Sequence, residues 1–460
     1  MQWWLYEKQK EAENPGISLW LLIFTYVVVI TFCLFIRATT WPNNKHIDAL
    51  FFLPALALPF LIITALMCFV NIFKSALVHY AEMRKFIALS QEYHLKKYAR
   101  KNIIIAGWSV ITPLEQPALN LLKLEGEFPL APKNPLKITQ EQGFDYTRIE
   151  QIFGELIGPL ATKLKNHNYR GFKTTLWVRG GDEYCCDELQ RMLGRFDINH
   201  NSDCQIEYLS ECPDYSLINT WIKQSETSRV NRLIFIIDIY GDDSDSKSME
   251  SACALLLTNR YVKIESEKPV YLYQPMAGVN DVEAKVPVYL QTEPVASPKT
   301  LWYTGLSRAE KYPLLKALDE QKQAPERLDI EASLGERSAG YRWLALALAA
   351  DAVKYAQGGQ LVAVSENNQF SIAALSSRQP PEPDDFKGFE HTQPWLFGGM
   401  SGILLMLSFW VYQFSFFDSK NPFSLWGFIA GSFTPLIVGG VIGILATWYS
   451  SKNACADMGW

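Results

Sequence analysis

Cysteine and histidine are the residues of this chain best suited to nucleophilic catalysis or metal binding, and their spacing matches no known site. The eight cysteines include the adjacent pair Cys185 and Cys186 but no C-x-x-C pair. Vicinal disulfides are strained, so we interpret this pair as two thiols on a helix. The six histidines are scattered, at His46, His79, His94, His167, His200 and His391. Neither residue type has the spacing of a zinc site.

One acidic cluster offers a further candidate for chemistry. Asp238, Asp242, Asp243 and Asp245 follow an apolar run, and oxygen-rich loops can hold Ca²⁺ or Mg²⁺. Their spacing matches no EF-hand loop, which favours a solvated turn. The chain also lacks a P-loop and the G-x-G-x-x-G, G-x-S-x-G and H-E-x-x-H motifs. We therefore expect no metal and no cofactor.

Four stretches of the chain contain no charged residue, namely 17–36, 49–73, 394–417 and 423–451. Each is long enough to cross a bilayer core of ~30 Å as a helix. None has an Asp, Glu, Lys, Arg or His in its interior, whereas proton and ion pathways usually need such groups. We therefore expect an anchor in the lipid bilayer made of two helical hairpins, 17–73 and 394–451.

Basic residues near the span ends predict the orientation. The segment after the second span contains Lys74, Arg84, Lys85, Lys96, Lys97, Arg100 and Lys101. This excess predicts a bacterial inner-membrane protein with four spans, whose soluble domain and both termini are cytoplasmic. The net charge of −5 argues against binding to nucleic acid.

Of the 320 residues between the hairpins, the stretch from Asn102 onward alternates strand and helix signals, which is typical of an α/β layered domain. Asn102–Ile111 and Leu233–Ile239 are apolar strand candidates, and 146–165 is an amphipathic helix candidate. Within the helix candidate 338–356, Trp343–Ala350 has no polar side chain except the indole, which predicts a helix buried between two layers. The expected order is a tail 1–16, hairpin 17–73, basic connecting helix 74–101, α/β domain 102–376, Pro-rich linker 377–393, hairpin 394–451 and tail 452–460.

Four segments of this domain, in order, resemble the β-ketoacyl synthases. Lys101–Leu114 (KNIIIAGWSVITPL) is similar to the family's opening strand and turn. Asn231–Asp238 (NRLIFIID) and Ser248–Leu257 (SMESACALLL) are similar to two later strands. Ser333–Gly340 (SLGERSAG), with the helix after it, is similar to a K-x-x-x-G-H segment and its buried helix. The resemblance implies a thiolase-like fold of αβαβα layers, in which a homodimer is a further expectation.

The resemblance also implies a cysteine nucleophile at a helix N-terminus, assisted by two histidines or by histidine and asparagine. Cys212 lies roughly where the nucleophile is expected, but Glu211 beside it would disfavour a thiolate. Glu336 occupies the position of one histidine, and no histidine lies between His200 and His391. We therefore expect Cys212 and Glu336 to mark a degenerate site, and the chain not to be an enzyme. The alternative is an acyl-thioester enzyme that acts on lipids with Cys212 as nucleophile.

These observations predict a membrane-anchored scaffold, adaptor or accessory protein with a protein partner. Its layout and its opening sequence, MQWWLYEKQKEAENPG, are similar to those of accessory proteins of bacterial type VI secretion clusters. That similarity implies a secretion component or an effector as partner, in effector loading or in immunity.

Overall fold

The computed structural model describes residues 3–7, 18–42, 45–126, 129, 136–138, 146–169, 171–198, 206–240, 248–260, 268–321, 324–383, 393–416 and 424–459. The chain forms two compact units. One consists of Tyr93–Asp384 with Met1–Trp4, and the other of Leu5–Glu92 with Asp385–Trp460. The finer boundaries expected from the sequence remain predictions.

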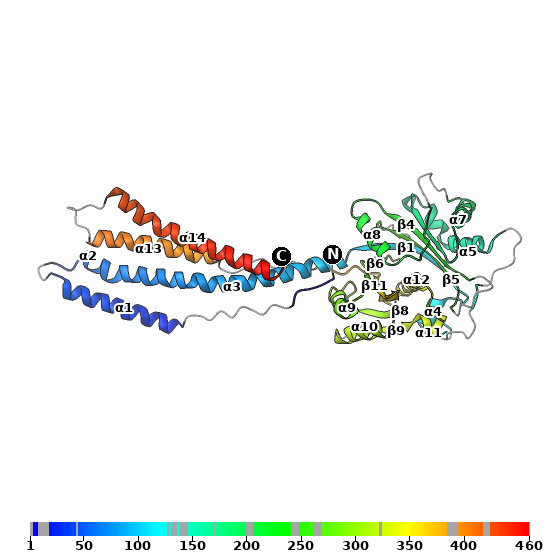
Figure 1. Ribbon diagram of the computed structural model, residues 1–460, viewed down its shortest axis with the longest axis horizontal. Helices are drawn as coiled ribbons and strands as arrows, with labels where there is room; N and C mark the ends of the chain where they lie inside the picture. The colour runs from blue at the N-terminus through cyan, green and yellow to red at the C-terminus, as the bar shows by residue number, and fades with distance from the viewer. Residues whose placement is uncertain are drawn as a thin grey trace. The chain divides into compact units, whose positions relative to one another are not determined.

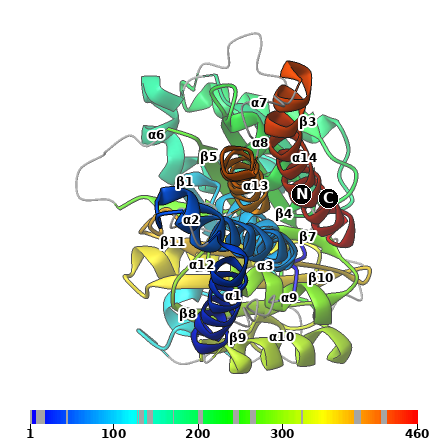
Figure 2. The same cartoon turned by 90° about the vertical axis from the view of Figure 1, so that its left-hand side faces the viewer.

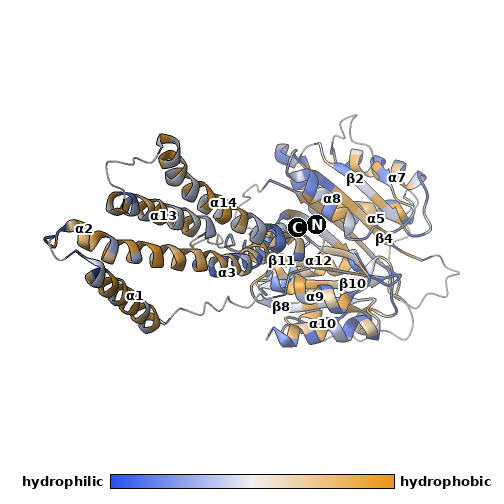
Figure 3. Ribbon diagram, turned by 60° about the vertical axis from the view of Figure 1, so that its left-hand side comes forward, coloured by the Kyte–Doolittle hydropathy of each residue, from blue (hydrophilic) through white to orange (hydrophobic). Residues whose placement is uncertain are grey.

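The second unit contains helices that are long and apolar enough to cross a membrane: α1 (Leu19–Thr40), α3 (Leu58–Ala99), α13 (Pro394–Phe416) and α14 (Leu425–Asp457). Hydrophobic residues predominate in α1 and along much of the other three helices (Figure 3). A short helix α2 (Ala49–Phe52) and a π-helical turn η1 (Leu53–Ala57) precede α3. Pro54 lies in this turn, where the looser hydrogen bonding tolerates its missing amide hydrogen.

Helices α13 and α14 pack closely through glycines (Figure 2). A Cβ atom on Gly439 would lie 2.5 Å from the carbonyl oxygen of Gly398, and one on Gly443 would lie 2.7 Å from Cα of Trp395. Small residues allow such approaches between membrane helices. Gly439 and Gly443 therefore allow the close approach of α14 to α13.

The first unit is built on a mixed sheet whose two halves repeat one topology. The first half contains β1 (Asn102–Ile111), β2 (Lys173–Val178), β3 (Ile206–Tyr208), β4 (Asn231–Asp238) and β5 (Ser251–Thr258), in the order β3-β2-β4-β5-β1. The second half contains β6 (Val270–Tyr273), β8 (Pro298–Thr304), β9 (Glu326–Asp329), β10 (Gly359–Glu366) and β11 (Gln369–Ser376), in the order β9-β8-β10-β11-β6. A further strand, β7 (Met276–Val279), pairs with β11.

Strand directions repeat as well as strand order. In each half the third and fourth strands are parallel to the second, and the fifth is antiparallel to both the fourth and the first. Antiparallel pairing of β1 with β6 joins the halves into one sheet. The domain is thus a structural duplication, which no repeat in the sequence revealed.

Helices occupy equivalent places in the two halves. The outer face of the first half is covered by α5 (Arg148–Ile157) and α7 (Tyr184–Arg195), whose apolar residues pack against Leu233, Phe235 and Leu256. Helices α9 (Val282–Gln291) and α10 (Arg308–Glu320) occupy the equivalent positions in the chain order of the second half. They lie on the side of the sheet away from α12 (Tyr341–Lys354) (Figure 1).

The middle layer consists of α8 (Ser216–Ser225) and α12, which are the equivalent helices of the two halves. Both pack into one core with the inner faces of both half sheets. Ten consecutive residues of α12, Tyr341–Ala350, are buried. This burial confirms the prediction for Trp343–Ala350, and it explains why the segment has no polar face.

Several elements differ from the sequence expectation. The helix expected over 146–165 is interrupted, because Gly158 and Pro159 begin a short 3-10 turn η2 (Gly158–Leu160) before α6 (Ala161–Lys165). The helix expected from Ser338 begins only at Tyr341. The expected first span 17–36 is shifted to Leu19–Thr40, and the helix after the second span continues to Ala99. The short helices α4 (Pro117–Leu121) and α11 (Ile330–Leu334) were not expected.

Candidate functional site

The N-termini of α8 and α12 meet in the middle layer, and Cys212 lies where they meet. The Cys212 thiol donates a hydrogen bond to the carbonyl oxygen of Ala339 (3.3 Å), and a guanidinium nitrogen of Arg342 donates to the Cys212 carbonyl (3.3 Å). The Trp343 indole donates to the Pro213 carbonyl (2.7 Å). These hydrogen bonds join the segment that precedes α8 to the start of α12 and to the residue that leads into it.

Asp238, the last residue of β4, gathers donors at this junction. It is completely buried, and its carboxylate accepts from the Gly340 amide at 2.8 Å. It also accepts from the Arg179 guanidinium and the Ser338 hydroxyl. A Cβ atom on residue 340 would lie 2.6 Å from the Asp238 carboxylate, so glycine permits this approach. The charge sits at the start of α12, where the helix dipole favours an anion.

Three further contacts complete the cluster. The Arg179 guanidinium lies over the Tyr240 ring, 4.9 Å from its centroid, and the Tyr240 and Ser338 hydroxyls are 3.0 Å apart. Arg342, which is buried, forms an ion pair with Glu366. We call Cys212, Arg179, Asp238, Ser338, Tyr240 and Arg342 the junction cluster.

The chemistry of Cys212 follows from its surroundings. Burial raises the pKa of the Cys212 thiol to about 12; the nearby Arg342 and Arg179 cations oppose the rise, and Asp238 adds to it. The thiolate is the nucleophilic form. In this arrangement Cys212 is therefore a protonated thiol at neutral pH.

Iodoacetamide should for this reason alkylate Cys212 slowly in the folded protein. A rise of the pKa from 9.0 to about 12 lowers the thiolate fraction by about a thousandfold at neutral pH. Mass spectrometry after timed labelling of the full chain in detergent would measure the rate, with the urea-unfolded chain as reference. Equal rates in the folded and unfolded chains would show that the thiol is not held as described.

The remaining sequence candidates lie in different places. Glu336 is exposed, after Gly335 and before α12. Cys185 is buried and Cys186 half-buried, both in α7, where burial raises the pKa of each thiol. Asp242, Asp243, Asp245, Cys204, His200 and His391 lie outside the described residues. Among the described residues, no three His, Cys, Asp or Glu side chains are grouped as metal ligands.

Sequence reasoning missed Arg179, Ser338 and Arg342 as members of the junction cluster. They come from two segments far apart in the chain, at 179 and 338–342, and only Ser338 lies within Ser333–Gly340, which the resemblance singled out. A signal was present for Asp238 only, as an acidic residue that ends an apolar strand.

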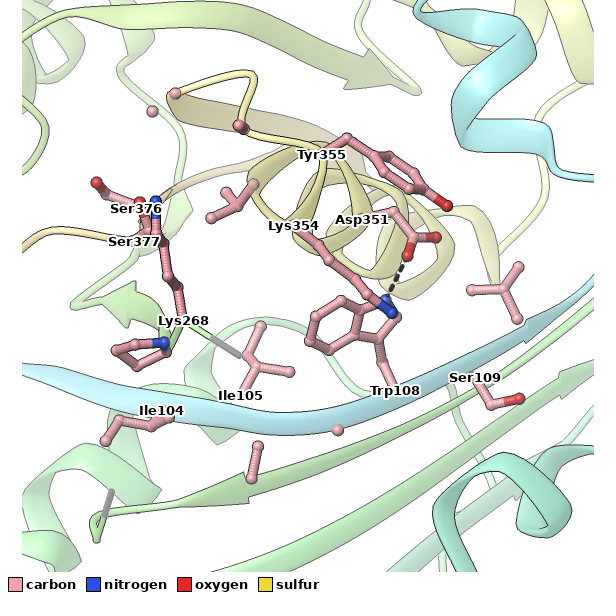
Figure 4. Close-up of a pocket in the computed structure, with 18 of the residues that line it drawn as sticks. Ile104, Ile105, Trp108, Ser109, Lys268, Asp351, Lys354, Tyr355, Ser376 and Ser377 are labelled. Atoms are coloured by element: carbon pink, nitrogen blue, oxygen red, sulfur yellow. Dashed lines mark hydrogen bonds between the residues drawn. The ribbon is translucent and has the colours of Figure 1, made fainter. Parts of the chain in front are cut away.

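A second candidate site is a groove along β1, with a volume of about 1340 Å³. One wall is β1 from Ile104 to Ile111, and the others include the end of α12, the α6 region and the chain after β11. Figure 4 shows Asp351 and Lys354 of α12 pointing toward Trp108 of β1. The Trp108 indole donates a hydrogen bond to Asp351 (2.7 Å). This groove was not expected from the sequence.

Comparison with known proteins finds similarity only among solved structures. No protein-family model and no curated protein matches the chain. A Streptomyces albus oxazolomycin ketosynthase domain is 12% identical, covers 62% of this chain and 98% of its own, and has a TM-score of 0.44. The AntDE:AntF complex, a type II ketosynthase with its acyl-carrier protein, is 10% identical, covers 60% and 99%, and has a TM-score of 0.43. The 3-oxoacyl-[acyl-carrier-protein] synthase III of Aquifex aeolicus is 12% identical, covers 60% and 99%, and has a TM-score of 0.38.

One expectation is corrected by these findings. The prediction that the chain is not an enzyme is contradicted, because the solved structures found are ketosynthases and related synthases. The missing histidines had carried that prediction, and a missing motif does not exclude a different set of catalytic groups on such a domain. Identities of 10–12% assign neither an activity nor a substrate to this chain.

Proposed function

We propose that this chain is a membrane-anchored accessory or adaptor protein, whose α/β domain holds a protein partner in the groove along β1. The single observation that carries the proposal is the edge of β1 at Ala106–Ile111, beside which no described strand lies on the side away from β5. An unpaired edge is a template for another chain. The four long apolar helices support an anchor in the lipid bilayer. The expected setting is a bacterial type VI secretion assembly, with a secretion component or an effector as partner.

We further propose that both termini and the α/β domain are cytoplasmic at a bacterial inner membrane. The reason is the cluster of lysine and arginine after the second span, since such residues stay on the cytoplasmic side. An alkaline-phosphatase reporter fused after Trp460 should be inactive, and a green fluorescent reporter at the same place should fluoresce. Phosphatase activity from that fusion would reverse the orientation.

Affinity purification from detergent-solubilised membranes tests the adaptor role. The wild-type chain is compared with Lys299→Glu/Lys354→Glu, in which two exposed groove lysines are reversed, and with Lys173→Glu/Lys316→Glu, a matched pair of exposed lysines outside the groove. We expect one protein to be retained by the wild type and the outer pair and lost from the groove pair. Retention of the same proteins by all three would contradict binding in the groove.

A second candidate function is acyl transfer from a thioester to Cys212, as expected of an acyl-thioester enzyme that acts on lipids. The observation that favours it is the position of Cys212 near Arg342 and Arg179, whose positive charges lower the pKa of the thiol against the larger rise that burial causes. Incubation with a reactive acyl thioester should then give an adduct that Cys212→Ser abolishes. Absence of the adduct would remove this candidate and leave the adaptor role untouched.

A further inference from the structure

The edge of β1 that faces the groove has no neighbouring strand along most of its length. On one side, Ile104–Ile111 pairs with β5. On the other side, pairing with β6 covers only Asn102–Ile105. In the part of the chain that the structure describes, no strand lies beside Ala106–Ile111 on that side. Because alternate residues of an antiparallel strand direct their backbone groups to opposite neighbours, about half of these peptide groups face the groove.

The position of this edge is fixed from both sides. The pairing register with β5 shifts at Ala106, as in a β-bulge, and the Ala106 carbonyl accepts a hydrogen bond from the Lys163 ammonium (2.9 Å). A Cβ atom on Gly107 would lie 2.9 Å from the Leu160 side chain, so η2 lies directly on one face of the strand. On the other face lies Trp108, with Lys354 5.8 Å from its ring centroid. The two faces are covered and the edge lies open between them.

The charge of the groove indicates what chemistry it favours. Its charged lining residues are five cations, Lys163, Lys268, Lys299, Lys354 and Arg378, and three acids, Glu115, Glu155 and Asp351. The Asp351 carboxylate is already held by the Trp108 indole. The lining is therefore basic in a chain whose net charge is −5, and it complements an acidic occupant.

We propose that the groove binds an extended acidic segment of a partner protein, which pairs with β1 as an added strand. Backbone pairing with the edge at Ala106–Ile111 provides affinity, and the lysines select acidic side chains. The edge has room for about six residues, since a strand rises ~3.3 Å per residue. This inference rests on the proposed adaptor function and specifies the chemistry of its partner.

Peptide binding to the full chain in detergent micelles tests the inference. The probe is a fluorescent peptide in which valine and glutamate alternate, followed by anisotropy. A second peptide has lysine in place of glutamate. Two further copies of the acidic peptide carry N-methyl groups on one or the other set of alternate residues, which blocks backbone pairing along one edge of the peptide and leaves its side chains unchanged. The protein variants are Lys299→Glu/Lys354→Glu and the outer control Lys173→Glu/Lys316→Glu.

We expect saturable binding of the acidic peptide. Whichever N-methylated copy directs its methyl groups toward β1 should bind more weakly than the parent peptide by about tenfold or more. The groove variant should weaken binding by about tenfold and the outer control by less than about twofold. The lysine peptide should bind the wild type more weakly than the acidic one. Absence of saturable binding up to about 1 mM overturns the inference.

Other results would identify a different occupant and also overturn it. Equal binding of the parent peptide and both N-methylated copies would mean charge attraction without strand pairing. Displacement of the peptide by a palmitoyl thioester at lower concentration than by unlabelled acidic peptide would assign the groove to an acyl chain. If the peptide fails while affinity purification still shows a partner lost only from the groove variant, the adaptor role stands and the chemistry proposed for its partner is wrong.

Discussion

Replacement of Ala347 with glutamate is expected to prevent stable folding of the α/β domain. Ala347 lies in α12 with no exposed surface, among residues of both half sheets. A carboxylate there would have no partner in the native packing. The glutamate must therefore be protonated, or α12 must unfold locally to expose it to water. The expected cost is ~3 kcal/mol or more. Urea unfolding of the full chain in detergent, followed by tryptophan fluorescence, measures it.

The matched control for this change is on the same helix. Lys354 is exposed near the end of α12. Lys354→Glu should therefore change the free energy of unfolding by no more than about 0.5 kcal/mol, as ordinary surface substitutions do. An unfolding midpoint for Ala347→Glu equal to that of Lys354→Glu would mean that α12 does not lie between the two half sheets.

Removal of the Asp238 carboxylate should have the second large effect. Asp238→Ala leaves the half-exposed Arg179 guanidinium, the Ser338 hydroxyl and the Gly340 amide without their acceptor at the start of α12. Removing one partner of a buried ion pair typically destabilises a protein by ~3–5 kcal/mol. The same unfolding measurement applies, and the expected loss lies at the lower end of that range because water can reach Arg179.

An exposed ion pair supplies the comparison for Asp238. Asp319 and Arg327 lie 2.9 Å apart with side chains 63% and 41% exposed. Asp319→Ala should cost no more than ~1 kcal/mol, because solvent screens such pairs. If Asp238→Ala and Asp319→Ala were equally mild, the contacts of the buried Asp238 carboxylate would not stabilise the domain as described.

The sequence was informative where composition alone determines structure. Asn102–Ile111 is a strand with the expected bounds, because an apolar run of that length has few alternatives. The apolar segment Trp343–Ala350 predicted its own burial between layers. The four helices that are long and apolar enough to cross a membrane were similarly evident, since uncharged runs of this length are typical of membrane helices.

Elements at the edges of the second half were missed for physical reasons. Strand β9, ERLD, has one buried residue, Leu328, because it lies at the edge of the sheet and needs no apolar run. Helix α9 contains Pro287, which usually ends a helix. The duplication itself depends on strand order and direction, and those are preserved here without any repeat of residue types.

The candidate sites were less predictable than the fold. Cys212 stood out because the resemblance to the β-ketoacyl synthases directed attention to it. Its neighbours Asp238 and Arg342 are brought to it only by the meeting of α8 and α12. The groove along β1 depends on where the pairing with β6 ends, at Ile105, and no local pattern in the sequence fixes that point.

Photo-crosslinking in native membranes tests the central claim most directly. A photoreactive amino acid placed at Lys354, in the groove, is compared with one at Tyr312, which is exposed on α10 outside it. We predict that Lys354 yields a protein adduct whose crosslinked peptide is acidic, and that Tyr312 does not. Crosslinks from Lys354 to lipid alone, or the same protein adducts from both positions, would contradict a groove that holds a protein partner.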